Sequence, residues 1–306
     1  STMEDGEYLI IACKSYENGV DKLYPNITVK KIPGMLHADE TVLEVLHEPG
    51  KEAGSKSYVW VYRTSHYNAH PAVVYEYTLG RSGDYAKKFL ADWNGTYLHC
   101  DGYVGYKKLV GKTLCGCLVH VKRKFHEAYE INKSNEYTKQ GETYLRKLFQ
   151  LETKADEAEL SLRERLEMLQ TKSKQVLDEF YSWISQIESK ILPKSLMGKA
   201  ITYAINQKEY LENFLKDGRM QLSNNLVTQS VKPFVIGRSN WLFANTPNGA
   251  NASTLIYSII QSAILNNLIP QKYLTFVFDT IQSGRNASHL VPWSDEIPES
   301  CKNKKS

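Results

Sequence analysis

The sequence has few of the features that mark membrane proteins and secreted proteins. No apolar run approaches the roughly 18 residues that a membrane-spanning helix needs, and no secretory signal opens the chain, so we expect no membrane partner. The five cysteines lack the spacing of a disulfide framework, which favours a reducing, cytoplasmic location. These cysteines are Cys13, Cys100, Cys115, Cys117 and Cys301.

Strong net charge is also missing. The 306 residues carry a net charge of only +4, so binding to nucleic acid has to come from local patches. A zinc site is not indicated, because Cys115, Cys117 and His120 do not amount to four ligands at a usable spacing. Segment 105–113 resembles a phosphate-binding loop. It has one residue too many between its glycines and precedes a strand instead of following one, so we expect no nucleotide cofactor.

The sequence does contain the mixture of strands and helices that is typical of an α/β domain. Hydrophobic residues make up 42% of the chain and charged residues 24%, which is ordinary for a globular protein. We expect strands at 35–46, 57–63, 72–79, 96–100 and 113–120, and short helices at 82–93 and 104–109. The first three strands should form an antiparallel run, and residues 1–34 are hard to place. A mixed sheet flanked by helices is the expected architecture.

The middle of the chain is predicted to be helical. Helical periodicity is almost continuous from residue 121 to about residue 218, and Leu177 and Phe180 belong to one packed seam. Helices are expected again at 252–267 and 270–282. We therefore predict four parts, which are the first part of a sheet core at 1–125, a helical insertion at 126–218, a return to the core with carboxy-terminal helices at 219–293, and a polar tail at 294–306.

Two aspartates are the main candidates for a functional site. Asp39 and Asp101 each stand where an extended segment is expected to end. Two carboxylates at the ends of neighbouring strands can share divalent metal ions, and shared ions promote phosphoryl transfer. The alternative is that each aspartate only caps a turn. Glu40, the next residue, should point to the other face of its strand.

Two segments combine cations with aromatic residues. One contains His120, Lys122, Arg123 and Lys124, and the other contains Lys232, Arg238 and Trp241. Such segments suit a phosphate backbone with unpaired bases nearby. The alternative is a solvated basic face beside core aromatic residues.

Several segments together resemble transposases of the insertion-sequence 66 family. They are 36–41, 48–60, 100–106, 116–125, 193–200, 217–225, 232–243 and 248–253. The resemblance extends from about residue 36 to residue 293. It implies a ribonuclease H-like core with a DDE metal site, in which Asp39 and Asp101 are the first and second catalytic aspartates. It also implies a bacterial, cytoplasmic enzyme of DNA transposition and recombination. Such an enzyme uses two Mg²⁺ or Mn²⁺ ions and acts as a homo-oligomer on element ends and target DNA.

The sequence departs from the family pattern at the expected third carboxylate. The pattern has a glutamate at the position of Thr228 and another at the position of Gln261. The tryptophan and lysine that are usual near Leu118 and Ser239 are missing, and so are the family's amino-terminal leucine-zipper and cysteine-rich regions. Two hypotheses follow. The chain is either a metal-dependent DNA transposase, or a truncated or degenerate DNA-binding remnant without activity.

Overall fold

The computed structural model describes most of the chain. The described residues are 9–12, 26–29, 34–52, 54–287 and 289–303. Cys13 and the end of the predicted tail lie outside them. Within the described residues, no helix is both long enough and apolar enough to cross a membrane.

The central element of the fold is a five-stranded mixed sheet with the order β5-β4-β3-β6-β7. β4 pairs antiparallel with β3 and with β5, whereas β6 and β7 are parallel. The strands are β3 (Leu36–Glu44), β4 (Lys56–Thr64), β5 (Val73–Thr78), β6 (Tyr97–Cys100) and β7 (Thr113–Gly116). The predicted antiparallel run of three strands and the α/β class are therefore confirmed.

Two regions differ from the sequence-based expectation. The hard-to-place amino-terminal region contains β1 (Leu9–Ala12) and β2 (Asn26–Val29), which form a separate antiparallel pair. The strand predicted at 113–120 is wrong in its second half, because β7 ends at Gly116 and a helix begins at Leu118. A short apolar run suits a buried strand and a buried helix equally well, so periodicity did not separate them.

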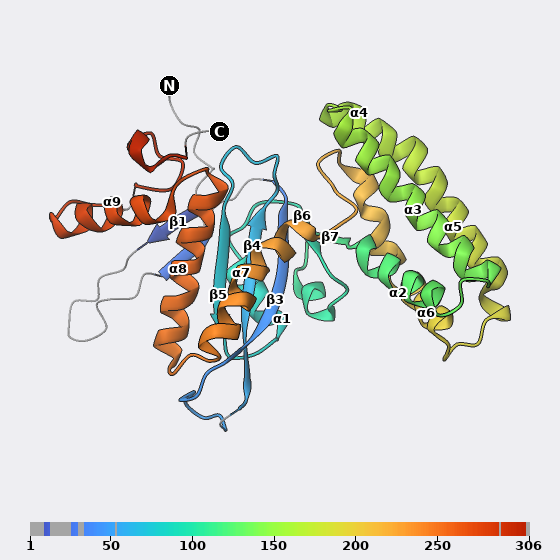
Figure 1. Cartoon of the computed structure of the whole chain (residues 1–306), viewed down its shortest axis with the longest axis horizontal. Helices are drawn as coiled ribbons and strands as arrows, with labels where there is room; N and C mark the ends of the chain where they lie inside the picture. Colours follow the sequence, from blue (N-terminus) through green and yellow to red (C-terminus); the bar gives the residue numbers. More distant parts are fainter. Residues whose placement is uncertain (1–8, 13–25, 30–33, 53, 288, 304–306) are drawn as a thin grey trace. The chain divides into compact units, whose positions relative to one another are not determined.

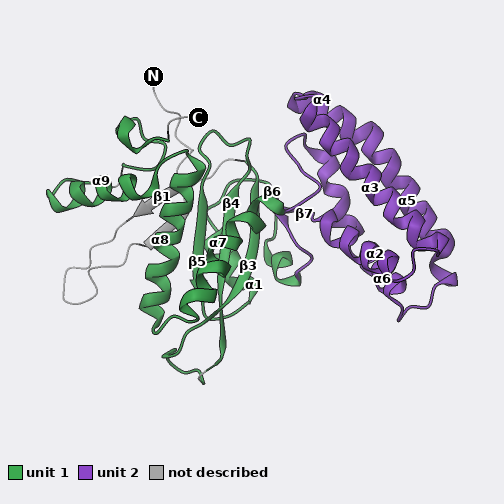
Figure 2. Cartoon of the chain, viewed as in Figure 1, with its two compact units in different colours: residues 1–96, 104–112, 225–306 green, residues 97–103, 113–224 purple. Residues whose placement is uncertain are grey.

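The chain divides into two compact units (Figure 2). The first contains residues 1–96, 104–112 and 225–306, and the second contains residues 97–103 and 113–224. The helices of the first unit are α1 (Gly83–Phe89), η1 (Val104–Lys108), α7 (Asn225–Trp241), α8 (Pro247–Leu265), α9 (Pro270–Gln282) and η5 (Glu299–Cys301). The second unit contains β6 and β7 together with the helices between residues 118 and 216.

In the first unit, one face of the sheet is covered by α1 and η1. The ring of Tyr62 on β4 stacks on Phe89 of α1, with ring centres 4.5 Å apart. Trp60, two residues earlier and so on the same face, meets the ring of Tyr106 in η1 at 5.4 Å. These aromatic contacts fix α1 and η1 against the sheet.

The opposite face of the sheet is covered by α7 and α8. Val59 and Val61 point to this face and share a buried core with Phe234 of α7. α8 runs along the edge strand β5, where the hydroxyls of Ser258 and Ser262 accept hydrogen bonds from the backbone of β5. These serines satisfy amide groups that an edge strand would otherwise leave unpaired. Figure 1 shows α8 alongside β5.

The second unit is a helical bundle joined to β6 and β7. Its helices are α2 (Leu118–Ile131), α3 (Glu136–Glu157), α4 (Leu162–Met168), α5 (Lys174–Ile187) and α6 (Leu196–Leu211), with a π-helical turn η2 (Leu169–Ser173) and 3₁₀ turns η3 (Glu188–Lys190) and η4 (Glu212–Lys216). α3 and α5 lie side by side (Figure 1). Aromatic rings form part of this contact, because Phe180 of α5 meets Tyr144 of α3 edge to face, and Phe180 also meets Phe125 of α2 edge to face.

The carboxy-terminal segment predicted as a polar tail contributes to a small core. Ile297 and Cys301 are buried together with Leu268 and Tyr273. The backbone amide of Ile269 donates to the carbonyl of Cys301, so the described part of the segment is attached to the loop between α8 and α9. The polar composition of the segment comes from exposed side chains that lie beside the buried Ile297 and Cys301.

Candidate catalytic site and nucleic-acid interface

Asp39 lies inside β3 and not at its end, which corrects the expectation from the sequence. Its Oδ1 accepts a hydrogen bond of 2.8 Å from the backbone N–H of Glu40. Its Oδ2 accepts one of 3.4 Å from the hydroxyl of Thr228. The structure therefore brings together the first predicted aspartate and the position where the family pattern has a glutamate.

Glu40 points away from Asp39, as the alternation of a strand predicts. Its side chain is only 1% exposed and forms an ion pair of 2.5 Å with Arg81. The hydroxyl of Tyr106 donates a second hydrogen bond of 2.7 Å to Glu40. Since a buried carboxylate needs such partners, Glu40 serves the α1 and η1 face and does not complete a site with Asp39.

The helix that carries Thr228 is held on the sheet by two arginines. Arg63 of β4 donates from Nη1 to the Leu226 carbonyl at 2.6 Å and to the Ser230 hydroxyl at 3.1 Å. Burial lowers the pKa of Arg63. Arg238, near the other end of α7, donates to the hydroxyl of Thr41 at 3.2 Å. α7 is therefore anchored on both sides of Thr228.

The two candidate positions for the third carboxylate are now distinguishable. Thr228 is on α7, which packs on β3 and β4, and it contacts Asp39 directly. Gln261 is on α8, which packs on the edge strand β5. Thr228 is therefore the position that belongs with Asp39.

Asp101 directly follows β6, so its predicted place at a strand end is confirmed. Its Oδ1 accepts a hydrogen bond of 2.9 Å from the N–H of Tyr103, which closes a local turn. The next residue is Gly102. A Cβ atom at Gly102 would lie 2.9 Å from the hydroxyl oxygen of Tyr203 and 3.3 Å from Nε2 of Gln207, both of α6. Glycine thus allows α6 to close over the turn that holds Asp101.

Side chains of α2 and α6 surround Asp101 within the second unit. Burial and then Asp101 raise the pKa of the Tyr203 hydroxyl to about 12, so it stays protonated at neutral pH. Burial lowers the pKa of His120, although Asp101 acts in the opposite direction. The ammonium group of Lys124 lies over the Tyr203 ring, 5.0 Å from its centre.

The three cations after His120 do not form one patch. Lys122 lies over the ring of Phe149 on α3 at 4.8 Å, whereas Lys124 lies over Tyr203 on α6. Arg123 is exposed between them. Successive residues of a helix point about 100° apart, so a run of three neighbours spreads over more than half of its circumference.

The residues of the second basic segment also differ in their surroundings. Lys232 is exposed and lies one helical turn after Thr228, on the same side of α7. Arg238 also donates to the carbonyl of Val42, so its guanidinium group is bound to β3. The ring of Trp241 packs against Phe234 at 5.4 Å, beside the core. Arg238 and Trp241 therefore hold α7 in place.

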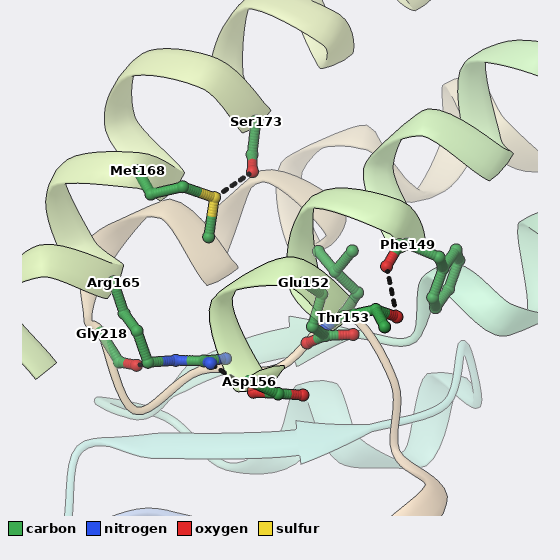
Figure 3. Close-up of polar contacts among 9 residues, drawn as sticks. Phe149, Glu152, Thr153, Asp156, Arg165, Met168, Ser173 and Gly218 are labelled. Carbon is green, nitrogen blue, oxygen red and sulfur yellow. Dashed lines mark hydrogen bonds and ion pairs between the residues drawn. The ribbon is translucent and has the colours of Figure 1, made fainter. Parts of the chain in front are cut away.

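Buried polar groups, which the sequence motifs did not reveal, bind the segment that returns from the bundle to α7. Arg165 donates from Nε to the carbonyl of Gly218 at 3.3 Å and pairs with Asp156, as Figure 3 shows. Glu152 accepts a hydrogen bond of 2.8 Å from the N–H of Leu222, and burial raises its pKa. No sequence signal marks these residues, because charged residues on a helix usually face water.

The same segment is also held from β6. The buried ring of His99 contacts the carbonyl of Gln221 through Nε2 at 2.9 Å. Burial lowers the pKa of His99 to about 4. The nearby cysteines Cys115 and Cys117 are buried and reduced, and burial raises the pKa of both thiols. Their burial agrees with a structural role.

Comparison with known proteins identifies the family. The family model described as "Transposase IS66 family" matches residues 11–252, which is most of the chain. The chain belongs to this family. The resemblance inferred from the sequence segments is therefore confirmed.

Curated relatives of this transposase family come from Sinorhizobium fredii. The chain is 30% identical over 274 residues to the uncharacterized protein y4qI, covering 84% of the chain and 50% of y4qI. It is 28% identical over 282 residues to the uncharacterized protein y4hP, with the same coverage. The chain thus spans about half the length of the curated relatives it matches.

Among solved structures, the chain is similar to one described as the Drosophila P element transposase strand transfer complex. The TM-score is 0.35 at 12% identity, with 72% of this chain and 75% of that chain covered. A simian T-cell lymphotropic virus intasome in complex with a PP2A regulatory subunit gives a TM-score of 0.22 at 9% identity, with 41% and 53% covered.

Proposed function

We propose that the chain is the ribonuclease H-like part of a bacterial transposase and acts on DNA. Membership of the IS66 transposase family and the mixed α/β fold support this proposal. Asp39 and Asp101 would be the ligands of a divalent ion, Mg²⁺ or Mn²⁺. Element ends and target DNA would be the partners of an oligomeric protein, and the cytoplasm its location.

The observation that carries the proposal is the contact between Asp39 and Thr228. In that contact the hydroxyl of Thr228 donates a hydrogen bond to the carboxylate of Asp39. An ionised glutamate at this position could not donate one. The helix α7 thus presents one residue to the first aspartate, as a three-carboxylate site requires. In this chain that residue is the uncharged Thr228.

The residues present do not fit two metal ions. Within the described part of the chain, no group of three or more histidine, cysteine, aspartate or glutamate side chains could hold a metal. Asp39 and Asp101 supply two negative charges and Thr228 supplies none, whereas two Mg²⁺ ions bring four positive charges. A neutral hydroxyl is a weak ligand for a hard cation. We therefore infer a DNA-binding transposase domain whose strand cleavage and transfer are weak or absent.

The proposal assigns DNA contact to fewer residues than the sequence suggested, because Arg238 and Trp241 hold α7 in place. His120 and Lys124 lie around Asp101, Arg123 is exposed beside them, and Lys232 is exposed beside Thr228. Lys122 contacts Phe149 on another side of α2. These four cations and His120 are the groups that would meet a phosphate backbone.

The experiment is a binding and nicking assay on DNA. The chain is titrated into labelled duplex DNA at several salt concentrations, and supercoiled DNA is incubated with the chain and Mn²⁺. We expect salt-dependent binding and little nicking. Sedimentation with and without DNA tests the oligomer. A chain that binds no DNA at low salt, either as a monomer or as an oligomer, would refute the proposal.

A further inference from the structure

We propose that Lys124, Tyr203 and Gln207 form a binding subsite for a DNA phosphodiester beside Asp101. This inference rests on the proposal that the chain acts on DNA. It assigns to the helical second unit a direct contact with the DNA strand.

The subsite is built from two helices that meet at one turn. Lys124 is on α2, and Tyr203 and Gln207 are one turn apart on α6, which packs against α2. Both α6 side chains reach the position where a Cβ of Gly102 would stand, and Gly102 follows Asp101 directly. Three side chains from two elements therefore converge within one residue of the second aspartate.

The chemistry of the three side chains suits a phosphodiester. The Tyr203 hydroxyl and the Gln207 amide are neutral hydrogen-bond donors, and Lys124 is a cation. Together with Arg123, Lys124 offsets the negative charge that Asp101 would present to a phosphate. A base is a poorer fit, because Lys124 lies over a face of the Tyr203 ring and so competes with stacking on that face.

The burial of these residues is intermediate, which fits a lined surface site. Lys124, Tyr203, Gln207, Asp101 and Gly102 are each neither buried nor fully exposed. A purely structural tyrosine looks different in the same bundle. Tyr181 is buried, and its hydroxyl donates to the carbonyl of Ala204 at 3.1 Å.

That tyrosine provides a matched control pair. Lys208 lies over the Tyr181 ring at 4.8 Å, as Lys124 lies over Tyr203. The substitutions Tyr203→Phe and Lys124→Ala therefore have counterparts in Tyr181→Phe and Lys208→Ala. Each pair removes the same atoms, once beside Asp101 and once in the bundle.

The experiment measures DNA affinity of the full chain by fluorescence anisotropy, in EDTA so that no metal contributes. We expect Tyr203→Phe to weaken binding about fivefold with an unchanged salt dependence, because it removes one neutral hydrogen bond. Lys124→Ala should also lower the slope of log affinity against log salt by about 0.9. Gln207→Ala should resemble Tyr203→Phe. Tyr181→Phe and Lys208→Ala should leave affinity and slope unchanged, whatever they do to the melting temperature.

A second measurement identifies the phosphate itself. DNA substrates that each carry one uncharged methylphosphonate linkage are compared with unmodified DNA. We expect one linkage to weaken binding by the original chain but not by Lys124→Ala.

If the original chain binds DNA and all three subsite variants match it in affinity and slope, the subsite is refuted while the proposed function stands. Equal losses in the subsite and control pairs would reduce the effect to bundle stability and would also refute it. If the original chain binds no DNA, both proposals are wrong.

Discussion

The hydroxyl of Thr228 donates a hydrogen bond to Oδ2 of Asp39 at 3.4 Å. This contact decides between two sequence positions that lack the family's glutamate. Gln261 is on α8 against the edge strand, whereas Thr228 is on α7 against β3. Restoring a carboxylate should therefore matter at residue 228 alone.

Thr228→Glu should increase Mn²⁺-dependent nicking of supercoiled DNA by about a hundred- to a thousandfold, the range typical of one preorganised electrostatic partner. The added carboxylate would supply the missing negative charge next to Asp39. Mn²⁺ affinity, followed by calorimetry, should rise as well.

Gln261→Glu is the matched control and should leave both quantities unchanged. Strong nicking by the original chain that Asp39→Asn abolishes would show that the site is complete without a carboxylate at residue 228.

Substitution by alanine should lower the stability of the fold at Arg238 and the salt slope of DNA binding at Lys232. Arg238→Ala removes hydrogen bonds from a guanidinium group to β3, and we expect it to lower the free energy of unfolding by about 2 kcal/mol. Lys232 is exposed, so Lys232→Ala should leave stability within about 0.5 kcal/mol and should lower the salt slope of DNA binding. Urea unfolding and anisotropy separate the two effects. A stable Arg238→Ala variant with a reduced salt slope would return Arg238 to the interface.

Gly102→Ala should weaken DNA binding more than it weakens the fold. The new methyl group would press on the ends of Tyr203 and Gln207, which can swing away at small cost. We expect a loss of about fivefold in affinity, similar to removal of the Tyr203 hydroxyl. The change in melting temperature should be small. A large loss of stability with unchanged affinity would argue that Gly102 serves packing alone.

Stability should fall as pH rises toward 8 because of Glu76. Burial raises the pKa of this carboxyl group to about 8. Between its ordinary pKa and that value, the unfolded chain releases the proton while the folded chain keeps it. Its contribution is therefore complete at low pH and declines as pH rises, by at most about 1.4 kcal/mol per pH unit. Glu76→Gln should flatten this slope in urea unfolding measured from pH 5 to 8. An equal slope in both proteins would place the pH dependence elsewhere.

Substitution of Arg165 and substitution of Asp156, which form an ion pair, should lower the free energy of unfolding by unequal amounts. The Arg165 side chain is 2% exposed, whereas that of Asp156 is 56% exposed. Asp156→Asn leaves a buried cation with less compensation and should cost about 3 kcal/mol. Arg165→Met leaves an exposed anion and should cost only about 1 kcal/mol. Denaturant unfolding of the two variants compares them, and a larger cost for Arg165→Met would contradict the asymmetry.

The sequence predicted the elements whose patterns are local. β4 and β5 are rich in β-branched and aromatic residues, and turn residues separate them from each other, so the antiparallel run that they form with β3 could be predicted. The run around Leu118 could not be assigned, because a few apolar residues fit either element. The apolar residues of α7 are not confined to its buried face, since Ile236 is exposed, and the helix contains Pro233, so periodicity alone did not reveal it.

The candidate site was predicted only in part, for a different reason. Asp39 and Asp101 could be named because they belong to recognisable segments, and Thr228 could be named because it closely follows one of them. The roles of Arg238 and Trp241 depend on which neighbours they meet, and those neighbours are distant in the sequence. Tyr203 and Gln207 carry no motif at all. Their approach to Gly102 is a property of how α6 packs.

The discontinuous first unit has a consequence for biosynthesis. It is assembled from three stretches of chain, the last of which begins at residue 225, whereas the second unit ends at residue 224. On the ribosome, the helical bundle can therefore close before α8 has emerged. Until α8 arrives, the amides of Val73 and Tyr75 lack Ser262 and Ser258 and form an open sheet edge. From the synthesis of β5 until that of α8, the nascent chain thus exposes an aggregation-prone strand, which is the kind of intermediate that chaperones bind.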